Sequence, residues 1–263
     1  MIHGKCLKRK RIFLLSKERG NFMTIGDMLD RLGIPADEET VRKLGVYHNF
    51  IMEKNQHINL TGVKDPAASL IKNVYDSLTV YDEKYFPKGG RVLDLGTGAG
   101  FPGMILAILR PDMQFVLMDS IQKKLTCVEE GAAAAGVKNV KCLHMRAEEG
   151  GRRKKLRETF DVVTARAVKS LPVIAEWSLP FVKEGGIFAA MKGPGAEEEL
   201  EAAGKILALM HAEGKETKTC TLPTGEERRI LYFQKNGPAP KTFPRKVGIA
   251  EKNPILSEST DQK

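Results

Sequence analysis

The sequence predicts an α/β fold whose sheet is mostly parallel and ends in an antiparallel hairpin. From residue 89 onward, short runs of β-forming residues alternate with helical stretches, which is typical of parallel βαβ units. A glycine-rich turn directly follows the first run, where such sheets often hold a ligand. The last two runs, 215–223 and 227–235, leave no room for a helix between them and must pair as a hairpin.

The chain from residue 23 to residue 88 has a helical pattern. Its apolar residues recur at spacings of three and four, which indicates amphipathic helices. Thr24 is a suitable N-cap for the first helix, and Asp27 stands at the position that completes a capping box. A turn over 59–66 and a helix over about 67–81 follow. We therefore expect a helical N-terminal subdomain over 23–88.

The part that follows, 89–236, contains the alternating elements. The expected strands before the hairpin are 91–96, 114–120, 139–147, 160–167 and 185–193. The expected helices are 101–110, 121–136, about 148–157, 170–182 and 195–213. A parallel sheet closed by a hairpin is the layout of the Rossmann-like class I methyltransferases. The tail 237–263 is rich in Pro and Lys and is expected to be irregular.

The charge of the chain is concentrated at its start. Of the formal net charge of +9, residues 1–22 supply +6, with seven basic side chains against one acidic. This extension could be a basic RNA-binding arm. We favour the hypothesis that translation starts at Met23, which N-terminal mass spectrometry of the native protein would test. No stretch is long and apolar enough to span a bilayer.

The four cysteines predict neither a metal site nor a disulfide framework. Cys6, Cys127, Cys142 and Cys220 form no CxxC pair and no cluster with His at metal-ligand spacing. We therefore expect no metal, and free thiols in a reducing cytoplasm.

The strongest motif is DLGTGAGFPG over 94–103. Glycines such as Gly96 and Gly98 let the backbone turn sharply and approach a ligand without a Cβ in the way. Phe101 lies in the same loop, and the following helix directs its free N–H groups at the site. The string also matches the dinucleotide fingerprint, so the loop alone does not choose between NAD and S-adenosylmethionine.

Acidic residues at the strand ends extend this site. Asp119 ends the second strand and can hold the ribose hydroxyls that both cofactors carry. Asp94, before the first glycine, favours S-adenosylmethionine, because the ammonium of that cofactor attracts a carboxylate and a pyrophosphate repels it. At the end of the third strand, the backbone N–H of Ala147 and the carboxylate of Glu148 could contact an adenine; a charged loop start is the alternative.

The fourth strand ends at Arg166 and lacks the catalytic motifs that several methyltransferase classes carry at this position. There is no Asn/Asp-Pro-Pro-aromatic turn for an exocyclic amine, and no cysteine for a pyrimidine carbon. Guanine N7 needs neither, because it has a lone pair and no proton to lose, so alignment suffices. Arg166 is a candidate for positioning, and a simple salt bridge is the alternative. Lys192 is a weaker candidate for a phosphate contact, and the basic run 152–157 is expected to be a solvated helix face.

The motifs together resemble the glucose-inhibited division protein B family, the small-subunit 16S rRNA guanine-N7 methyltransferases of bacteria. The resemblance covers about residues 23–255. It rests on NQHINLTGVKDP (55–66), YDSL (75–78), VLDLGTGAGFPGM (92–104), MRAEE (145–149), TARAVKSL (164–171), MKG (191–193) and PRKVGIAEKNPI (244–255).

The resemblance implies transfer of a methyl group from S-adenosylmethionine to N7 of a guanosine in the decoding-region loop of 16S rRNA. The cofactor positions that it implies are Gly96, Phe101, Ala147, Glu148 and Arg166. It supplies no catalytic acid or base. Lys54 and Asn73 depart from the family pattern, where Trp and His are frequent, and this leaves the RNA contacts of the helical part open.

Two other functions are compatible with parts of the sequence. An NAD-dependent oxidoreductase would use the same loop, but the hairpin, Asp94 and the lack of a hydride-transfer constellation argue against it. A non-enzymatic RNA-binding or ribosome-assembly factor could keep the fold, but the intact glycine loop argues for a bound cofactor. The expected partner is 16S rRNA or the small ribosomal subunit, in the cytoplasm, and the charge is compatible with a monomer.

Overall fold

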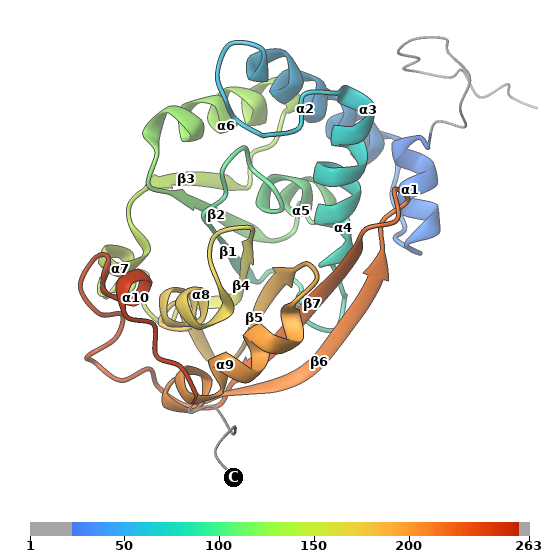
Figure 1. Cartoon of the computed structure of the whole chain (residues 1–263). Coiled ribbons are helices and arrows are strands. Elements are labelled where there is room, and N and C mark those ends of the chain that lie inside the picture. Colours follow the sequence, from blue (N-terminus) through green and yellow to red (C-terminus); the bar gives the residue numbers. More distant parts are fainter. Residues whose placement is uncertain (1–22, 258–263) are drawn as a thin grey trace, which may run out of the picture.

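The computed structural model describes residues 23–257 and has three layers, with helices on both faces of one seven-stranded sheet (Figure 1). The basic extension 1–22 lies outside these residues. The sheet has the order β3-β2-β1-β4-β5-β7-β6. Its strands are β1 Arg91–Leu95, β2 Gln114–Asp119, β3 Val140–His144, β4 Phe160–Arg166, β5 Val182–Lys192, β6 Ala212–Thr221 and β7 Glu227–Lys235.

The pairing confirms the expected class. Strands β1 to β5 are parallel to one another, whereas β7 pairs antiparallel with β5 and with β6. The hairpin thus closes one edge of the sheet, as in the Rossmann-like class I methyltransferases. From β1 the chain adds strands in one direction, to β2 and β3, and from β4 it adds them in the other. In such sheets a ligand crevice forms between the two central strands, here β1 and β4, at their carboxyl ends.

The helices before the sheet are shorter and more varied than expected. They are α1 Ile25–Arg31, α2 Glu38–Asn55, α3 Pro66–Ser69, the π-helix η1 Leu70–Tyr75 and α4 Asp76–Thr79. The capping box is confirmed, because Thr24 and Asp27 exchange hydrogen bonds of 3.1 and 2.8 Å between side chain and backbone. The helix expected over 67–81 therefore consists of two α-helical turns with a π-helical segment between them, a type of segment frequent at functional sites.

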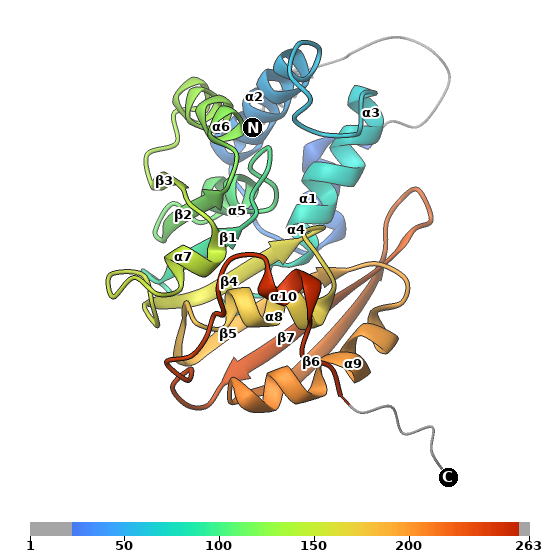
Figure 2. The same ribbon diagram turned by 60° about the vertical axis from the view of Figure 1, so that its left-hand side comes forward.

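The remaining helices alternate with the strands. They are α5 Gly103–Leu109, α6 Gln122–Ala135, α7 Ala147–Gly150, α8 Leu171–Ser178, α9 Ala196–Leu209 and α10 Ile249–Lys252. Figure 2 shows α8, α9 and α10 on one side of the sheet and the N-terminal helices on the other.

Each face of the sheet has its own apolar core. Ile230 and Tyr232 of β7 point into the core beneath α1 to α6, whereas Leu231 and Phe233 point into the core beneath α8 and α9. This is the period-two alternation of a strand buried on both faces. The N-terminal helices share the first core with α5 and α6, and a subdomain boundary at residue 88 stays a prediction. Trp177 is buried in the second core.

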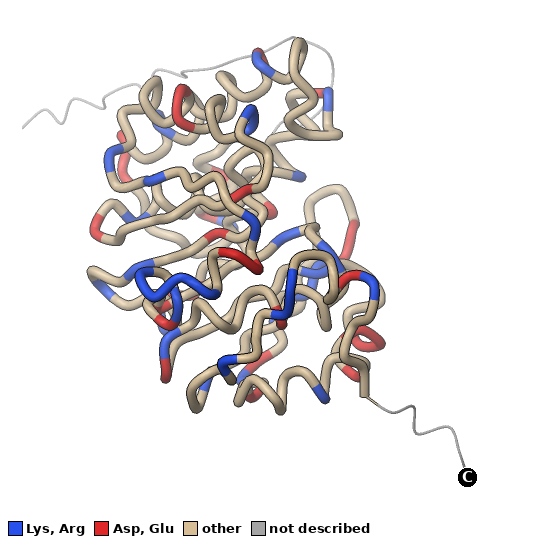
Figure 3. The backbone as a smooth tube through the Cα atoms, turned by 90° about the vertical axis from the view of Figure 1, so that its left-hand side faces the viewer, with Lys and Arg blue, Asp and Glu red and all other residues tan. Residues whose placement is uncertain are grey.

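The basic run 152–157 is not the helix face that the sequence predicts. Helix α7 ends at Gly150, and turns follow as far as residue 158. Arg157 explains the departure, because its guanidinium donates hydrogen bonds of 2.7 to 3.1 Å to four backbone carbonyls. Three of those carbonyls belong to the tail, so Arg157 ties this segment to residues 239–243. The exposed residues 152–155 form one continuous blue stretch in Figure 3.

No helix within residues 23–257 is both long and apolar enough to cross a membrane. The same residues contain no group of three or more His, Cys, Asp or Glu side chains placed to hold a metal ion. Cys127 is buried and Cys142 and Cys220 are partly buried, all as free thiols, while Cys6 lies outside the described residues.

Candidate cofactor and base site

The buried side chain of Asp94 holds the glycine loop in place from inside the protein. Its carboxylate is fully buried and accepts hydrogen bonds from the hydroxyls of Thr97 and Thr164, at 2.6 and 2.8 Å, and from the N–H of Gly103 at 2.9 Å. Burial raises the pKa of Asp94, while these donors and Arg166 oppose the rise. The carboxylate points into the protein, where these donors occupy it. Its function here is to fix the loop between β1, β4 and α5.

The loop backbone takes a path that suits glycine. Gly96, Gly98 and Gly100 have φ angles of +69°, +57° and +82°. A Cβ on Gly100 would lie 2.1 Å from the hydroxyl of Tyr47, and a Cβ on Gly96 would lie 2.7 Å from Val168. A Cβ on Gly98 would meet only one protein atom within 4 Å, at 4.0 Å, so this glycine borders open space. Gly98 thus marks where a ligand can approach the backbone.

Tyr47 holds the loop from outside the sheet, through a contact that local sequence patterns do not predict. Its hydroxyl donates a 2.8 Å hydrogen bond to the carbonyl of Ala99, and its ring packs edge-on against Phe101. The side chain is fully buried. The residue fitted the apolar face of a helix, and only the fold brings it to the loop, 52 positions further along the chain.

The predicted cofactor residues of β1 and β2 come together at adjacent strand ends. The carboxylate of Asp119 accepts a hydrogen bond of 2.9 Å from the N–H of Gly98 and another of 2.9 Å from the N–H of Ile121. The N–H of Gly96 donates to the carbonyl of Met118 at 2.9 Å. The acid and the glycine loop are thus held in fixed relation, with further acceptor positions left on the carboxylate.

The β3 corner is tied to the tail. Ala147 and Glu148 begin α7, directly beyond the end of β3. The Glu148 carboxylate is buried and accepts a 3.0 Å hydrogen bond from the N–H of Gly248, at the start of α10. Lys169, in the loop after β4, forms a 2.9 Å ion pair with Glu251 of α10. The tail that the sequence predicts to be irregular therefore has a defined path beside the corner.

Arg166 links the sheet to the N-terminal helices. It donates hydrogen bonds to the carbonyl of Lys72 at 2.9 Å, to Asp76 at 3.0 Å and to Asn73 at 3.2 Å. Its guanidinium also lies over the ring of Phe101, 5.6 Å from the centroid. Arg166 thus makes the salt bridge considered as the simpler alternative, and it also stands between the glycine loop and η1. Asn73, which departs from the family pattern, is one of its partners.

A cavity of about 580 Å³ opens where η1 and α4 meet the ends of β4 and β5. Its lining includes Thr61, Asn73, Asp76, Arg166, Val168 and Arg228. Val168 both lines the cavity and covers Gly96, so the cavity adjoins the glycine loop. A volume of this size is ordinary for a small-molecule site and accommodates a nucleobase.

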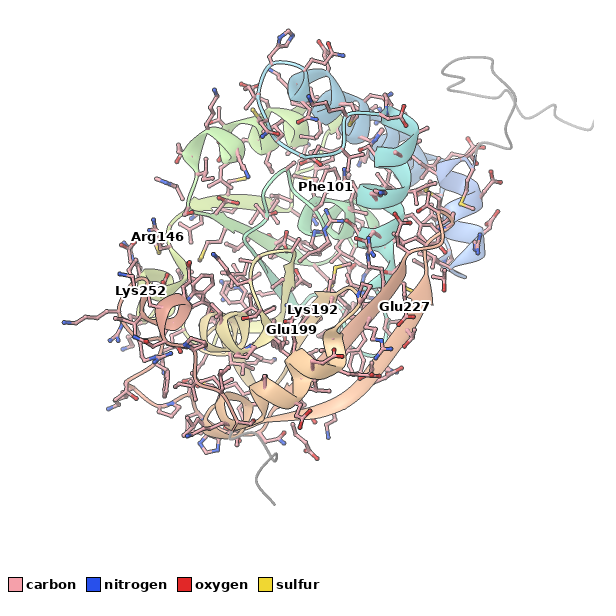
Figure 4. All side chains as sticks on the ribbon, viewed as in Figure 1. Phe101, Arg146, Lys192, Glu199, Glu227 and Lys252 are labelled. Atoms are coloured by element: carbon pink, nitrogen blue, oxygen red, sulfur yellow. The ribbon has the colours of Figure 1, made fainter. Side chains whose placement is uncertain are left out.

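Lys192 and two other basic residues already have partners within the protein. Lys192 forms a 2.7 Å ion pair with Glu199 and donates to the carbonyl of Lys169, so a phosphate would have to displace these partners; Figure 4 shows Lys192 and Glu199 side by side. Lys235 is fully buried against Glu158, and Arg245 pairs with the buried Glu176 at 2.6 Å.

The residues present fit a sulfonium nucleoside. Gly98 presents backbone without obstruction, Asp119 offers carboxylate oxygens to a ribose, and the buried Asp94 shapes the turn. These features, on a parallel sheet closed by a hairpin, define the class: a Rossmann-like methyltransferase.

The comparisons narrow this class. A model of the GidB family, described as rRNA small subunit methyltransferase G, matches residues 40–231. The chain is 37% identical over 224 residues to ribosomal RNA small subunit methyltransferase G of Moorella thermoacetica, covering 85% of this chain and 93% of the relative. It is 38% identical over 238 residues to the enzyme of that name from Leuconostoc mesenteroides, covering 89% of this chain and 100% of the relative. The chain belongs to the GidB family.

Among solved structures, the chain is similar to Aeropyrum pernix fibrillarin with natively bound S-adenosyl-L-methionine. The TM-score is 0.45 and the identity 16%, over 60% of this chain and 72% of that one. A likeness of this size says nothing about substrate.

Proposed function

We propose that this protein transfers a methyl group from S-adenosylmethionine to N7 of a guanosine in 16S rRNA. The relatives at 37% and 38% identity are named small-subunit rRNA methyltransferases, and the chain spans nearly their whole length. The observation that carries the proposal is the glycine loop, with Gly98 facing open space next to the Asp119 carboxylate. The target guanosine in the decoding-region loop follows from the family resemblance.

The cofactor is held by the predicted residues at three strand ends. Gly96, Gly98 and Phe101 would form the loop wall, and Asp119 would accept hydrogen bonds from the ribose hydroxyls. Ala147 and Glu148 would border the adenine, and the N–H of Gly248 already fixes the Glu148 carboxylate. Arg166, whose guanidinium lies over the ring of Phe101, borders both the loop and the cavity in which the base would be held.

The chain has to align the base rather than deprotonate it. S-adenosylmethionine supplies a methyl group on a positively charged sulfur, and N7 accepts it through a lone pair that carries no proton. Alignment in a protected cavity then provides most of the rate enhancement. The charge of Arg166, which lines the cavity, is neutralised by Asp76, and this lowers the cost of the positive charge that the base acquires.

The substrate is reached as part of the small subunit or its RNA, in the cytoplasm, where ribosomes are assembled. Seven basic side chains, four in the run 152–155 and three in the tail, are exposed and have no ion-pair partner among the described residues. They are therefore available to contact the RNA backbone. They are Arg152, Arg153, Lys154, Lys155, Lys241, Lys246 and Lys252.

Two measurements test this function. Calorimetry should show binding of S-adenosylhomocysteine and none of NAD. Labelled methyl transfer should then modify 16S rRNA, offered as free RNA and as small subunits, but not the same RNA with 7-deazaguanosine at the target. Methylation of the deaza substrate would exclude N7 as the acceptor, and binding of NAD alone would exclude the methyltransferase.

A further inference from the structure

We propose that Asp76 is the residue that selects guanine, by accepting hydrogen bonds from the Watson–Crick edge of the base. This inference rests on the proposed function and names a specificity-determining residue within its site. Asp76 begins α4, directly after the π-helix, and lines the cavity next to the glycine loop.

The Asp76 carboxylate is buried but has unused acceptor capacity. The residue is 4% exposed, and Oδ2 accepts one hydrogen bond, from Arg166 at 3.0 Å. Among the residues that the structure describes, no group donates a hydrogen bond to Oδ1. Arg228 Nε lies 3.2 Å from Oδ1, close enough for an ion pair but without the orientation of a hydrogen bond. Because an unsatisfied buried acceptor is costly, this oxygen points to a donor supplied by a ligand.

Guanine offers the donors that such a carboxylate needs. Its Watson–Crick edge carries the N1 hydrogen and the N2 amino group side by side, which match two carboxylate oxygens. Adenine presents an unprotonated N1 at the same place and would be repelled. Enzymes that modify a base commonly identify it by hydrogen bonds to this edge. N7 lies on the opposite edge of guanine, so a base held at Asp76 leaves N7 free to face the cofactor loop.

Charge favours the same arrangement. Methylation at N7 makes the base a cation, and a carboxylate on its other edge stabilises that charge as it develops. The guanidinium groups of Arg166 and Arg228 both lie within ion-pair distance of the Asp76 carboxylate. The two arginines also hold the carboxylate in position, one from β4 and one from β7.

The test compares guanosine with inosine at the target position of 16S rRNA. Inosine keeps N7, O6 and the N1 hydrogen and lacks only the N2 amino group. The rRNA is ligated with either nucleoside and supplied in the form that the wild-type enzyme methylates. Loss of one charge-assisted hydrogen bond should lower kcat/KM of the wild-type enzyme on inosine roughly ten- to a hundredfold. Equal kcat/KM on both substrates would overturn the proposal and leave the methyltransferase function intact.

The variant Asp76→Asn distinguishes recognition of the guanine base by Asp76 from a purely structural role of this residue. It should lower kcat/KM on guanosine and bring the guanosine-to-inosine ratio close to one, whereas a purely structural role would lower both rates and keep the ratio. Asp112→Asn is the matched control, since Asp112 pairs with Arg110 at 2.7 Å and neither residue lines the cavity, and it should keep the wild-type ratio. If Asp76→Asn does not fold, as judged by thermal melting, the wild-type ratio alone decides. No methylation of guanosine by the wild-type enzyme would instead contradict the proposed function.

Discussion

The hydroxyl of Tyr47 donates a 2.8 Å hydrogen bond to the carbonyl of Ala99, so a helix outside the sheet supports the loop proposed to hold the cofactor. The same hydroxyl occupies the space that a side chain at Gly100 would need. The N-terminal helices therefore support the loop in which we propose that the cofactor binds.

Tyr47→Phe should weaken cofactor binding while keeping the fold. Losing the hydroxyl leaves the Ala99 carbonyl without its donor. We therefore expect the binding free energy of S-adenosylhomocysteine to become less favourable by about 1 kcal/mol. Calorimetry measures this change. Tyr85→Phe is the control, because its hydroxyl contacts Glu216 at 3.1 Å, far from the loop. An affinity unchanged in Tyr47→Phe would remove Tyr47 from the site.

Gly98→Val should abolish binding of S-adenosylhomocysteine. The branched side chain would project into the open space beside Asp119, and a φ of +57° is strained for any residue with a Cβ. Gly98→Ala should retain weak binding and so separate steric blockage from backbone strain. Methylation at the normal rate by Gly98→Val would show that the cofactor lies elsewhere.

Arg166→Ala should remove methylation and reduce stability. The substitution leaves the buried Asp76 with Arg228 as its remaining cationic partner, which costs roughly 3 kcal/mol in the free energy of unfolding. Urea unfolding measures that loss, and labelled methyl transfer measures the activity. In Arg166→Ala/Asp76→Asn most of the stability should return and the activity should not. An active Arg166→Ala enzyme would reduce this arginine to a structural salt bridge.

His48 should make the fold sensitive to mild acid. Burial lowers the pKa of His48 to about 4, so the unfolded chain binds a proton more readily than the folded protein between that value and the ordinary pKa of about 6.5. Stability therefore falls as the pH drops through this window, by about 2 kcal/mol between pH 7 and pH 5. Urea unfolding at both values measures the change. His48→Gln should show a smaller difference, and an equal difference in both proteins would assign the effect to other groups.

The sequence predicted the order of the strands and the glycine-rich turn after β1, because both depend on local patterns. Strand periodicity, the glycine spacing and the β6–β7 hairpin are readable within about 20 residues. The contacts of Asp76 were not predictable in this way. Its partners Arg166 and Arg228 lie 90 and more positions further along the chain, and only the packing of α4 against β4 and β7 brings them together.

Two features depend on partners that are distant in sequence. The hydroxyl of Thr164, on the neighbouring strand, donates to Asp94 and helps to hold its carboxylate inside the protein. The run 152–157 was expected to be helical, but the tail supplies carbonyls that hold Arg157 in a turn. In this run, local propensity was overridden by partners distant in sequence.

The most direct test is the methylation state of 16S rRNA in cells. Small-subunit rRNA from cells with the gene should carry 7-methylguanosine in the decoding-region loop, and rRNA from cells without it should carry unmodified guanosine there. Wild-type protein should restore the modification, and Gly98→Val should not. The same 7-methylguanosine content with and without the gene would contradict the proposed function.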